Sequence, residues 1–427
     1  MEKNATKLPD GRIVHSEAPL NVEMPFETVD TFVTPTESFY VRTHFPIPKI
    51  DRDAWWLHVE GKVEKPFAIN YEELVELDSH TIPVTLECAG NNRDFLEPKV
   101  KGVQWGLGAV GTAEWTGVPL SALLDRALVR PQSREIILEG ADGGILEDPK
   151  SPPGTLRFSR SIPLEKARRD VFLAYRMNGK ELPPEHGFPV RAIVPGWYAM
   201  ASIKWLQRII VSEEQFTAYY QTLDYAYWKR QGDIAELTPL AEMHVKAEIA
   251  KPVQGETVPA NSSIRVHGAA WTSDGEIAKV ELSTDGGSTW KEANLLGESE
   301  PNAWRLWEFN WKTPSVPGKQ TLVARATDSL GQTQPVQRDP DRGTYMITHL
   351  LPLPLKCVEF SFWGAQAAQP VLFGSLPKSS LNAPRKIFLA TLSCRRQGCR
   401  RLQAGSLRSP KLEMPMPILL NLATRSG

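Results

Sequence analysis

The stretch Val280-Glu-Leu-Ser-Thr284 alternates apolar and polar side chains, then runs through Asp285-Gly-Gly287 into Ser288-Thr-Trp290. Such alternation, broken by a glycine-rich turn, is typical of a β-hairpin. Three neighbouring runs also look like strands: 263–267, 305–311 and 320–328. Because turn residues separate these runs and no helical period appears, residues 241–352 are predicted to form a β-sandwich of the immunoglobulin kind.

Residues 37–240 mix short strands with short helices. Helices are predicted at 71–77 and at 119–127, the second because apolar residues recur at i+3, i+4 and i+7 from Leu120. Asn70 and Thr116 are the expected caps. Strands are predicted at 39–41, 56–59, 83–86, 135–138, 190–194 and 203–211. Since the helices are short and the loops long, we predict an α+β domain rather than a doubly wound sheet.

The two ends of the chain differ from its interior. Residues 1–36 are polar and lack a sustained period, which predicts an extended N-terminal arm. Residues 353–427 are predicted to be a low-order tail, because from Pro354 onward they hold 11 Lys and Arg against 2 acidic residues. This tail is interpreted either as a basic docking segment or, preferably, as a coding product appended after the natural end.

Composition excludes several classes of function. The 427 residues carry a net charge of −1, which gives no general attraction to nucleic acid. No apolar run approaches the roughly 18 residues of a membrane span. The start is polar, so we expect a cytoplasmic protein, or a periplasmic one if an export signal is missing from this start. Four cysteines do not make a disulfide framework, and only Cys88 lies in the first 356 residues.

Two motifs are set aside. Gly106-Leu-Gly108-Ala-Val-Gly111 matches a dinucleotide-binding pattern, but 116–119 interrupts any helix after it, so we predict a glycine-rich loop. Cys394 and Cys399 have no second pair and no histidine nearby, so they are a weak zinc candidate.

The segment Thr85-Leu-Glu-Cys88-Ala-Gly-Asn-Asn-Arg93 carries the strongest chemical signal. A strand runs into a cysteine, a turn of small residues and then an arginine. The thiol is either a buried packing residue or a thiolate whose charge Arg93 favours, which suits a soft metal or a nucleophile. Composition leaves both alternatives open.

Four segments occur together in order: Phe39-Tyr-Val-Arg42-Thr-His44-Phe-Pro46, Leu86-Glu-Cys88-Ala-Gly-Asn-Asn-Arg93, His186-Gly-Phe-Pro-Val-Arg191 with Val194-Pro-Gly196, and Ser202-Ile-Lys204-Trp205. In combination they resemble the sulfite oxidase family of molybdenum enzymes over roughly residues 35–350. The resemblance implies a mixed α/β molybdopterin-binding domain at 37–240, followed by an immunoglobulin-like β-sandwich dimerisation domain at 241–352.

The resemblance also implies a cofactor, molybdopterin with one molybdenum, and no haem. Cys88 would be the single protein ligand to the metal, since a thiolate suits a soft redox metal. The positions that carry over as cofactor-binding are Tyr40, Val41, Arg42, Thr43, His44, Cys88, Asp142, His186, Arg191, Ser202, Ile203 and Lys204.

The chemistry that the resemblance implies is oxygen-atom transfer. Sulfite would be oxidised to sulfate, and the electrons would pass to a separate acceptor, a cytochrome or oxygen. A small anionic substrate needs a positive pocket, for which Arg42 and Arg93 are expected. Tyr225 would hydrogen-bond the substrate and assist proton movement, and Trp105 would wall the pocket. A homodimer through the β-sandwich is expected, with neither nucleic acid nor a membrane span.

The sequence departs from the family pattern at two places. Asn92 stands where the family commonly has arginine, and the further pocket arginine has two candidates, Arg338 and Arg342, that do not align cleanly. A molybdenum-dependent reductase of nitrate or of an S- or N-oxide is therefore the alternative function. A binding protein with a degenerate cofactor domain is a third alternative, which the absence of bound pterin would favour.

Overall fold

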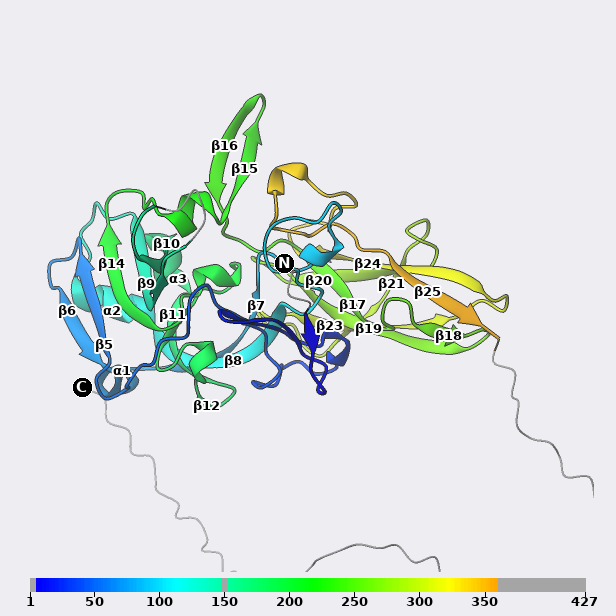
Figure 1. Ribbon diagram of the computed structural model, residues 1–427, viewed down its shortest axis with the longest axis horizontal. Coiled ribbons are helices and arrows are strands. Elements are labelled where there is room, and N and C mark those ends of the chain that lie inside the picture. Colours follow the sequence, from blue (N-terminus) through cyan, green and yellow to red (C-terminus); the bar gives the residue numbers. More distant parts are fainter. Residues whose placement is uncertain (1–4, 147–151, 360–427) are drawn as a thin grey trace, which may run out of the picture. The chain divides into compact units, whose positions relative to one another are not determined.

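Two five-stranded sheets form the framework of the first domain in the computed structural model, which describes residues 5–146 and 152–359 (Figure 1). The β9 sheet has the order β10 (Leu156–Pro163), β9 (Glu135–Gly144), β14 (Leu206–Ser212), β5 (Trp56–Gly61) and β6 (Phe67–Asn70). The β8 sheet has the order β12 (Lys180–Glu181), β11 (Phe172–Met177), β8 (Val110–Pro119) and β7 (His80–Glu87), with β13 (Arg191–Ile193) also paired to β11. Only β14 and β5 pair in parallel among these strands.

Helices in the described residues are few and short, which confirms the α+β prediction. The α-helices are α1 (Tyr71–Val75), α2 (Leu120–Ala127) and α3 (Leu164–Arg169). Single turns occur at η1 (Phe26–Thr28), η2 (Arg93–Phe95), η3 (Pro184–His186), η4 (Ala199–Ala201), η5 (Tyr219–Leu223) and η6 (Pro340–Arg342). Asn70 caps α1 as predicted, in a capping box with Glu73. The predicted cap Thr116 is wrong: it lies inside β8 and bonds Thr81, and Pro119 precedes α2 instead.

The described part of the N-terminal arm forms strands rather than an extended chain. The strands β1 (Thr6–Lys7), β2 (Ile13–Glu17) and β3 (Leu20–Glu23) make an antiparallel sheet that ends on β4 (Val41–Arg42). The buried carboxylate of Glu23 accepts hydrogen bonds from the backbone N–H groups of Gly106 and Gly108, at 3.0 and 2.9 Å. Local period alone misses this sheet because its strands have two to five residues, too few to show an alternation.

The glycine-rich segment is a loop that enters β8, and no helix follows it, as predicted. A Cβ atom at Gly108 would clash with the carbonyl oxygen of Met24. The glycine therefore serves a close approach of two backbones rather than a phosphate site.

The second domain is a β-sandwich of two mostly antiparallel sheets, as the hairpin stretch predicted. One sheet has the order β17 (Lys246–Lys251), β19 (Ser263–Trp271), β23 (Arg305–Lys312) and β22 (Asn294–Leu296). The other has the order β18 (Thr257–Pro259), β25 (Leu353–Val358), β24 (Gly318–Asp328), β20 (Ile277–Ser283) and β21 (Lys291–Glu292). Asp285 shapes the predicted turn by accepting hydrogen bonds from the N–H groups of Ser288 and Thr289.

The last described strand corrects the predicted start of the tail. Residues 353–358 form β25, which pairs antiparallel with β24 and parallel with β18. Leu353, Leu355 and Cys357 point into the sandwich core, and the residues between them are more exposed. This period of two is a strand signal that the basic composition after it had obscured. The rest of the predicted tail, including Cys394 and Cys399, lies outside the described residues.

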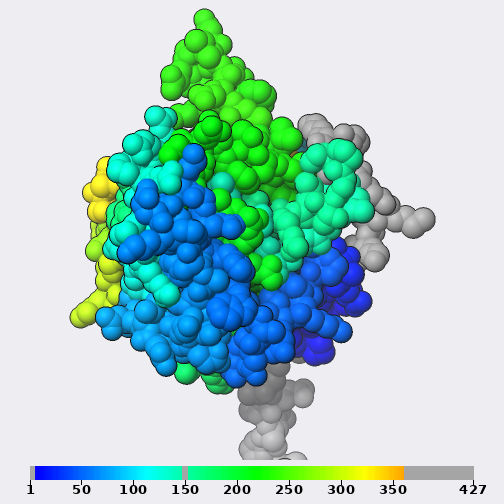
Figure 2. Space-filling model, turned by 90° about the vertical axis from the view of Figure 1, so that its left-hand side faces the viewer, coloured from blue at the N-terminus to red at the C-terminus, as the bar shows by residue number. Residues whose placement is uncertain are grey.

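A hairpin of β15 (Ala226–Gln231) and β16 (Ile234–Pro239) stands out from the surface in both views (Figures 1 and 2). Trp228 pairs with Leu237 across it, and the tryptophan is 49% exposed. Beside the turn at its tip, Arg230 forms a salt bridge with Asp341. Within the described ranges, no helix is long and apolar enough to cross a membrane.

If β25 belongs to the sandwich core, Leu355→Ala should lower the free energy of unfolding by about 2–5 kcal/mol, because it removes a buried side chain and leaves a cavity. The adjacent exposed substitution Lys356→Ala is the control and should change it by less than about 0.5 kcal/mol. Urea unfolding followed by tryptophan fluorescence measures the free energy of unfolding of both variants. Equal losses in the two variants would show that β25 does not belong to the core.

Candidate functional site

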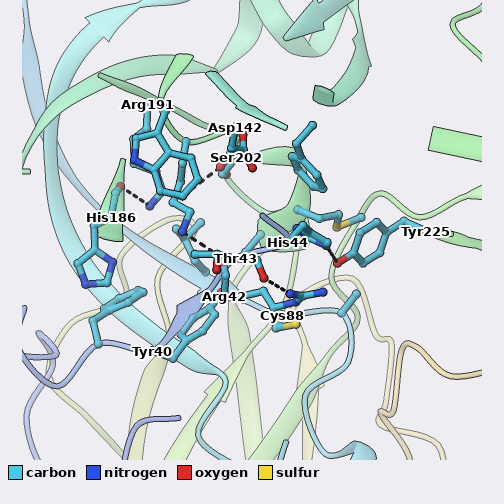
Figure 3. Close-up of a pocket in the computed structure, with 18 residues that line it drawn as sticks. Tyr40, Arg42, Thr43, His44, Cys88, Asp142, His186, Arg191, Ser202 and Tyr225 are labelled. Carbon is cyan, nitrogen blue, oxygen red and sulfur yellow. Dashed lines mark hydrogen bonds between the residues drawn. The ribbon is translucent and has the colours of Figure 1, made fainter. Parts of the chain in front are cut away.

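Two cavities meet at one wall of the first domain. The empty space of the inner cavity is about 670 Å³ and that of the outer cavity about 1750 Å³, each including the open solvent at its mouth. Four side chains line both cavities: Arg42, His44, Cys88 and Tyr225. Figure 3 shows the residues around the inner cavity, which come from segments far apart in the sequence. The wall that these four residues share is therefore where a group bound inside would meet a substrate entering from outside.

Cys88 sits directly after the last residue of β7. Its backbone N–H donates to the carbonyl oxygen of Ala109 at 2.9 Å, and its own carbonyl accepts from Asn91 at 2.8 Å. The residue is 7% exposed, yet its side chain lines both cavities. The two alternatives for this cysteine, a buried packing residue and a thiol at a site, are therefore not exclusive, because the residue is buried and also faces a cleft.

Cys88 is the one thiol that the described residues offer to the cavities. The other cysteine among them, Cys357, is buried in the sandwich. The described residues contain no group of three or more His, Cys, Asp or Glu side chains able to hold a metal ion. A metal at Cys88 would therefore need further ligands that these side chains do not supply.

Cations outnumber anions around the inner cavity. Arg42, Arg191 and Lys204 line it together with a single carboxylate, that of Asp142. Lys204 Nζ donates to the carbonyl oxygens of Arg42 and Glu185, at 3.0 and 2.8 Å. Such a wall attracts an anionic group.

Arg191 is anchored at two of its three nitrogens. It donates to the carbonyl oxygens of His186 and Ser202, both at 3.0 Å, and lies 4.9 Å from the ring of Trp115. Its Nε is buried and has no partner among the described residues. A buried donor without an acceptor is costly, which indicates that a bound group supplies one.

Burial moves the pKa values of the ionisable groups in this cavity. It lowers the pKa of Lys204 to about 7, helped by the charge of Arg191. It raises the pKa of Asp142 to about 6, although Lys204 opposes the shift. Burial also lowers the pKa of His186 to about 3, so this imidazole is neutral at neutral pH.

Tyr225 and His44 form the polar contact nearest to the shared wall. The Tyr225 hydroxyl and His44 Nε2 are 2.7 Å apart. Burial raises the pKa of Tyr225, and burial together with the charge of Arg42 holds the pKa of His44 well below its usual range. Both groups are therefore neutral at neutral pH, and each takes part in hydrogen bonds in its neutral form.

The outer cavity is formed partly by the end of the second domain. Arg93 lines it, donates from Nε to the carbonyl oxygen of Thr344 at 3.1 Å, and lies 5.2 Å from the ring of Tyr345. The hydroxyl of Tyr345 donates to Asp224 at 3.3 Å. Sequence reasoning missed Lys101, Asp224 and Tyr345, because they lie in loops without a local pattern.

Most of the predicted site residues come together. The inner cavity is lined by Tyr40, Arg42, Thr43, His44, Cys88, Asp142, His186, Arg191, Ser202, Lys204 and Tyr225. Val41 and Ile203 are buried beside it and line neither cavity. Trp105 also lines neither cavity: it is fully buried, with its ring 4.8 Å from that of His15.

Neither candidate for the further pocket arginine reaches the cavities. Arg338 bonds the carbonyl oxygen of Gly343. Arg342 pairs with Asp339 and lies 4.6 Å from the ring of Tyr227. The wall that this segment contributes to the outer cavity is instead 343–345.

Comparison with known proteins agrees with this arrangement. The family described as oxidoreductase molybdopterin binding domain matches residues 44–220, and that described as Mo-co oxidoreductase dimerisation domain matches 238–341. Sulfite oxidase of Gallus gallus is 35% identical over 76% of this chain and 73% of its own length. Mitochondrial sulfite oxidase of Rattus norvegicus is 34% identical over 75% of this chain, which spans 61% of that protein.

Two further relatives broaden the comparison. Nitrate reductase [NADH] of Petunia hybrida is 32% identical over 74% of this chain and 38% of its own length. Among solved structures, the sulfane dehydrogenase SoxCD from Paracoccus pantotrophus is similar with a TM-score of 0.69 and 25% identity. That similarity covers 82% of this chain and 87% of the SoxCD chain.

The depressed pKa of Lys204 has a consequence for the stability of protein purified without cofactor. Between about pH 7 and pH 10.5 the unfolded chain keeps a proton on this lysine that the folded chain has lost, so stability rises with pH there. From about pH 6 to pH 9, wild type should gain on the order of 1–3 kcal/mol relative to Lys204→Met. Urea unfolding of wild type and Lys204→Met at both pH values measures this gain in stability. If the stability of the two proteins changed equally with pH, the prediction would be wrong.

Proposed function

The chain belongs to the sulfite oxidase family of molybdopterin-dependent oxidoreductases, and we propose that it oxidises sulfite to sulfate and passes the electrons to a separate acceptor. The observation that carries this proposal is the position of Cys88, whose side chain lines both the inner cavity and the cation-lined outer cavity. The match to a dimerisation domain at 238–341 supports a homodimer through the sandwich.

The inner cavity fits a molybdopterin. Arg191 Nε supplies an unpaired buried donor, and Lys204 and Ser202 line the same wall. Asp142 and His186 add groups able to bond a heterocycle with mixed donors and acceptors. Cys88 would give the one protein sulfur. When bound, the molybdenum centre supplies the redox change and the transfer of an oxygen atom.

The outer cavity fits a small anion. Arg42 lines both cavities, so its charge is available to a substrate at the shared wall, and Arg93 lines the outer side. Arg93 is held in place by the carbonyl oxygens of Thr344 and Val103. Fixed cations stabilise an oxyanion better than mobile ones because they need no reorganisation. These two arginines would therefore bind sulfite and the developing sulfate.

Tyr225 and His44 would handle protons. The oxidation of sulfite by water releases protons as well as electrons, and the hydrogen-bonded pair lies at the shared wall. Since both groups are neutral, the tyrosine hydroxyl would donate a hydrogen bond to an anion, and the imidazole, whose lowered pKa disfavours the charged form, would hold a released proton only in passing.

A reductase of nitrate is the second candidate. It is favoured by the identity to a nitrate reductase and by Arg338 and Arg342, which line neither cavity in the described chain. Steady-state assays decide between sulfite oxidation and nitrate reduction. One assay supplies sulfite with ferricyanide as the electron acceptor, and the other supplies nitrate with reduced viologen as the electron donor. Faster turnover of nitrate than of sulfite would replace the proposal.

Cys88→Ser should abolish sulfite oxidation, lowering kcat by at least about a hundredfold, because a hydroxyl is a poor ligand for a soft metal. The assay uses protein from a host that makes molybdopterin, with molybdenum measured per chain. Cys357→Ser, in the sandwich core, is the matched control and should keep its molybdenum. Full activity in Cys88→Ser, or no molybdenum in wild type, would end the assignment.

Arg42→Gln should raise the KM for sulfite by about tenfold to a hundredfold, because one charge-assisted contact contributes about 1.5–3 kcal/mol. Arg342→Gln is the control, since that guanidinium lies on Tyr227 outside the cavities, and its KM should stay within about twofold. A raised KM in Arg342→Gln with an unchanged KM in Arg42→Gln would place the anion site at the end of the second domain instead.

A further inference from the structure

A buried polar cluster joins the Cys88 loop to the sandwich. Glu87, the residue before Cys88, accepts a hydrogen bond from Lys246 Nζ at 2.9 Å and another from Trp271 Nε1 at 2.9 Å. All three side chains are almost completely buried. Lys246 begins β17 and Trp271 ends β19, so both partners come from the second domain. The cluster therefore holds the end of β7 from across the domain boundary.

The same cluster continues to the residues after the thiol. Asn91 Nδ2 donates to Glu87 at 3.2 Å, and its Oδ1 accepts from the N–H of Ala109 at 3.0 Å. The carbonyl of Ala109 in turn accepts the N–H of Cys88. Asn91 thus links the carboxylate of Glu87 to the strand that fixes the backbone of the metal-ligand candidate.

Asn92 adds a second link to β17. Its Nδ2 donates to Glu248, which is buried and lies 3.6 Å from Lys246. Its backbone has φ 71°, a left-handed conformation that asparagine adopts more readily than most residues. Asn92 is the position where this sequence departs from the family pattern, and here it has a defined partner.

Stability alone does not explain this cluster. Removing two charges from water costs about as much as their attraction returns, so apolar side chains of the same volume would hold the domains together equally well. Hydrogen bonds differ from apolar contacts because each one fixes a direction. The bonds to the Glu87 carboxylate restrain the residue before Cys88, and the bond from Ala109 to Asn91 restrains the residue that accepts the N–H of Cys88.

We propose that Lys246 is a positioning residue: through Glu87 and Asn91 it holds the Cys88 loop in the conformation that presents the thiol to the cavities. The sandwich then has a part in building the metal site in addition to any part in dimerisation. This inference rests on the proposed function only in taking Cys88 as the metal ligand.

The test measures how fast maleimide modifies Cys88 in protein purified without cofactor. Cys357, Cys394 and Cys399 are replaced by alanine so that a single thiol remains. Lys246→Met leaves the Glu87 carboxylate buried without its cation, so the loop should open more often and the rate should rise about tenfold. Asn91→Ala should raise the rate similarly without creating an unpaired charge, which keeps the test valid if Lys246→Met fails to fold.

Two further variants separate positioning from general loss of stability. The double variant Glu87→Gln with Lys246→Gln removes the unpaired buried charge, and its amide oxygen at position 87 still accepts from Asn91 or from Trp271, so its rate should lie clearly below that of Lys246→Met. Lys166→Met removes another buried lysine, bonded to Asp170 and outside both cavities, and should leave the rate unchanged. Wild-type rates in both Lys246→Met and Asn91→Ala would overturn the proposal, as would an equal rise in Lys166→Met.

Molybdenum per chain gives an independent readout in protein from a molybdopterin-producing host. It should fall in Lys246→Met by at least about threefold and fall less in the double variant, because a misplaced thiol holds the metal less well. If wild type itself binds no molybdenum, the proposed function fails, while the maleimide rates still decide whether Lys246 positions the loop.

Discussion

The pairing of β7 with β8 is the constraint on which the site depends. Its register runs without a shift from His80 to Glu87, and the next hydrogen bond, from Cys88 to Ala109, continues it by one residue. The strand therefore ends at a fixed point, and the thiol leaves the sheet where both cavities meet. Because the second half of β7 and most of β8 are buried, this point is set by the packing of the sheet rather than by the loop that follows.

The inner cavity holds several buried cations beside one carboxylate, and this excess of positive charge determines how the cations are bonded. Arg42, Arg191 and Lys204 would repel one another in a closed apolar space, and the structure relieves this with backbone carbonyl groups rather than with acidic side chains. Carbonyl oxygens orient a cation without neutralising it. The inner cavity keeps a positive field for this reason, and an anionic cofactor completes the balance of charge.

Local patterns predicted the parts of the fold that depend on neighbours in sequence. The turn at Asp285, the cap at Asn70 and the apolar face of α2 all follow from short-range rules. The four family segments located most of the inner cavity. Trp105 and Arg342 were predicted to line the pocket, and neither does. Their positions depend on contacts with His15 and Tyr227, which no local period reveals. The N-terminal sheet escaped prediction because its strands are too short to show a period.

The contacts that tie the two domains together are backbone bonds as well as side-chain bonds. The N–H of Thr85 donates to Asn302, the N–H of Trp304 donates to the Thr85 hydroxyl, and the N–H of Met346 donates to Ala89. These bonds flank Cys88 on the chain that carries it. These bonds couple the two domains energetically: unfolding of the sandwich would remove restraints on both sides of Cys88, and a ligand bound in the cavities would stabilise the sandwich together with the first domain.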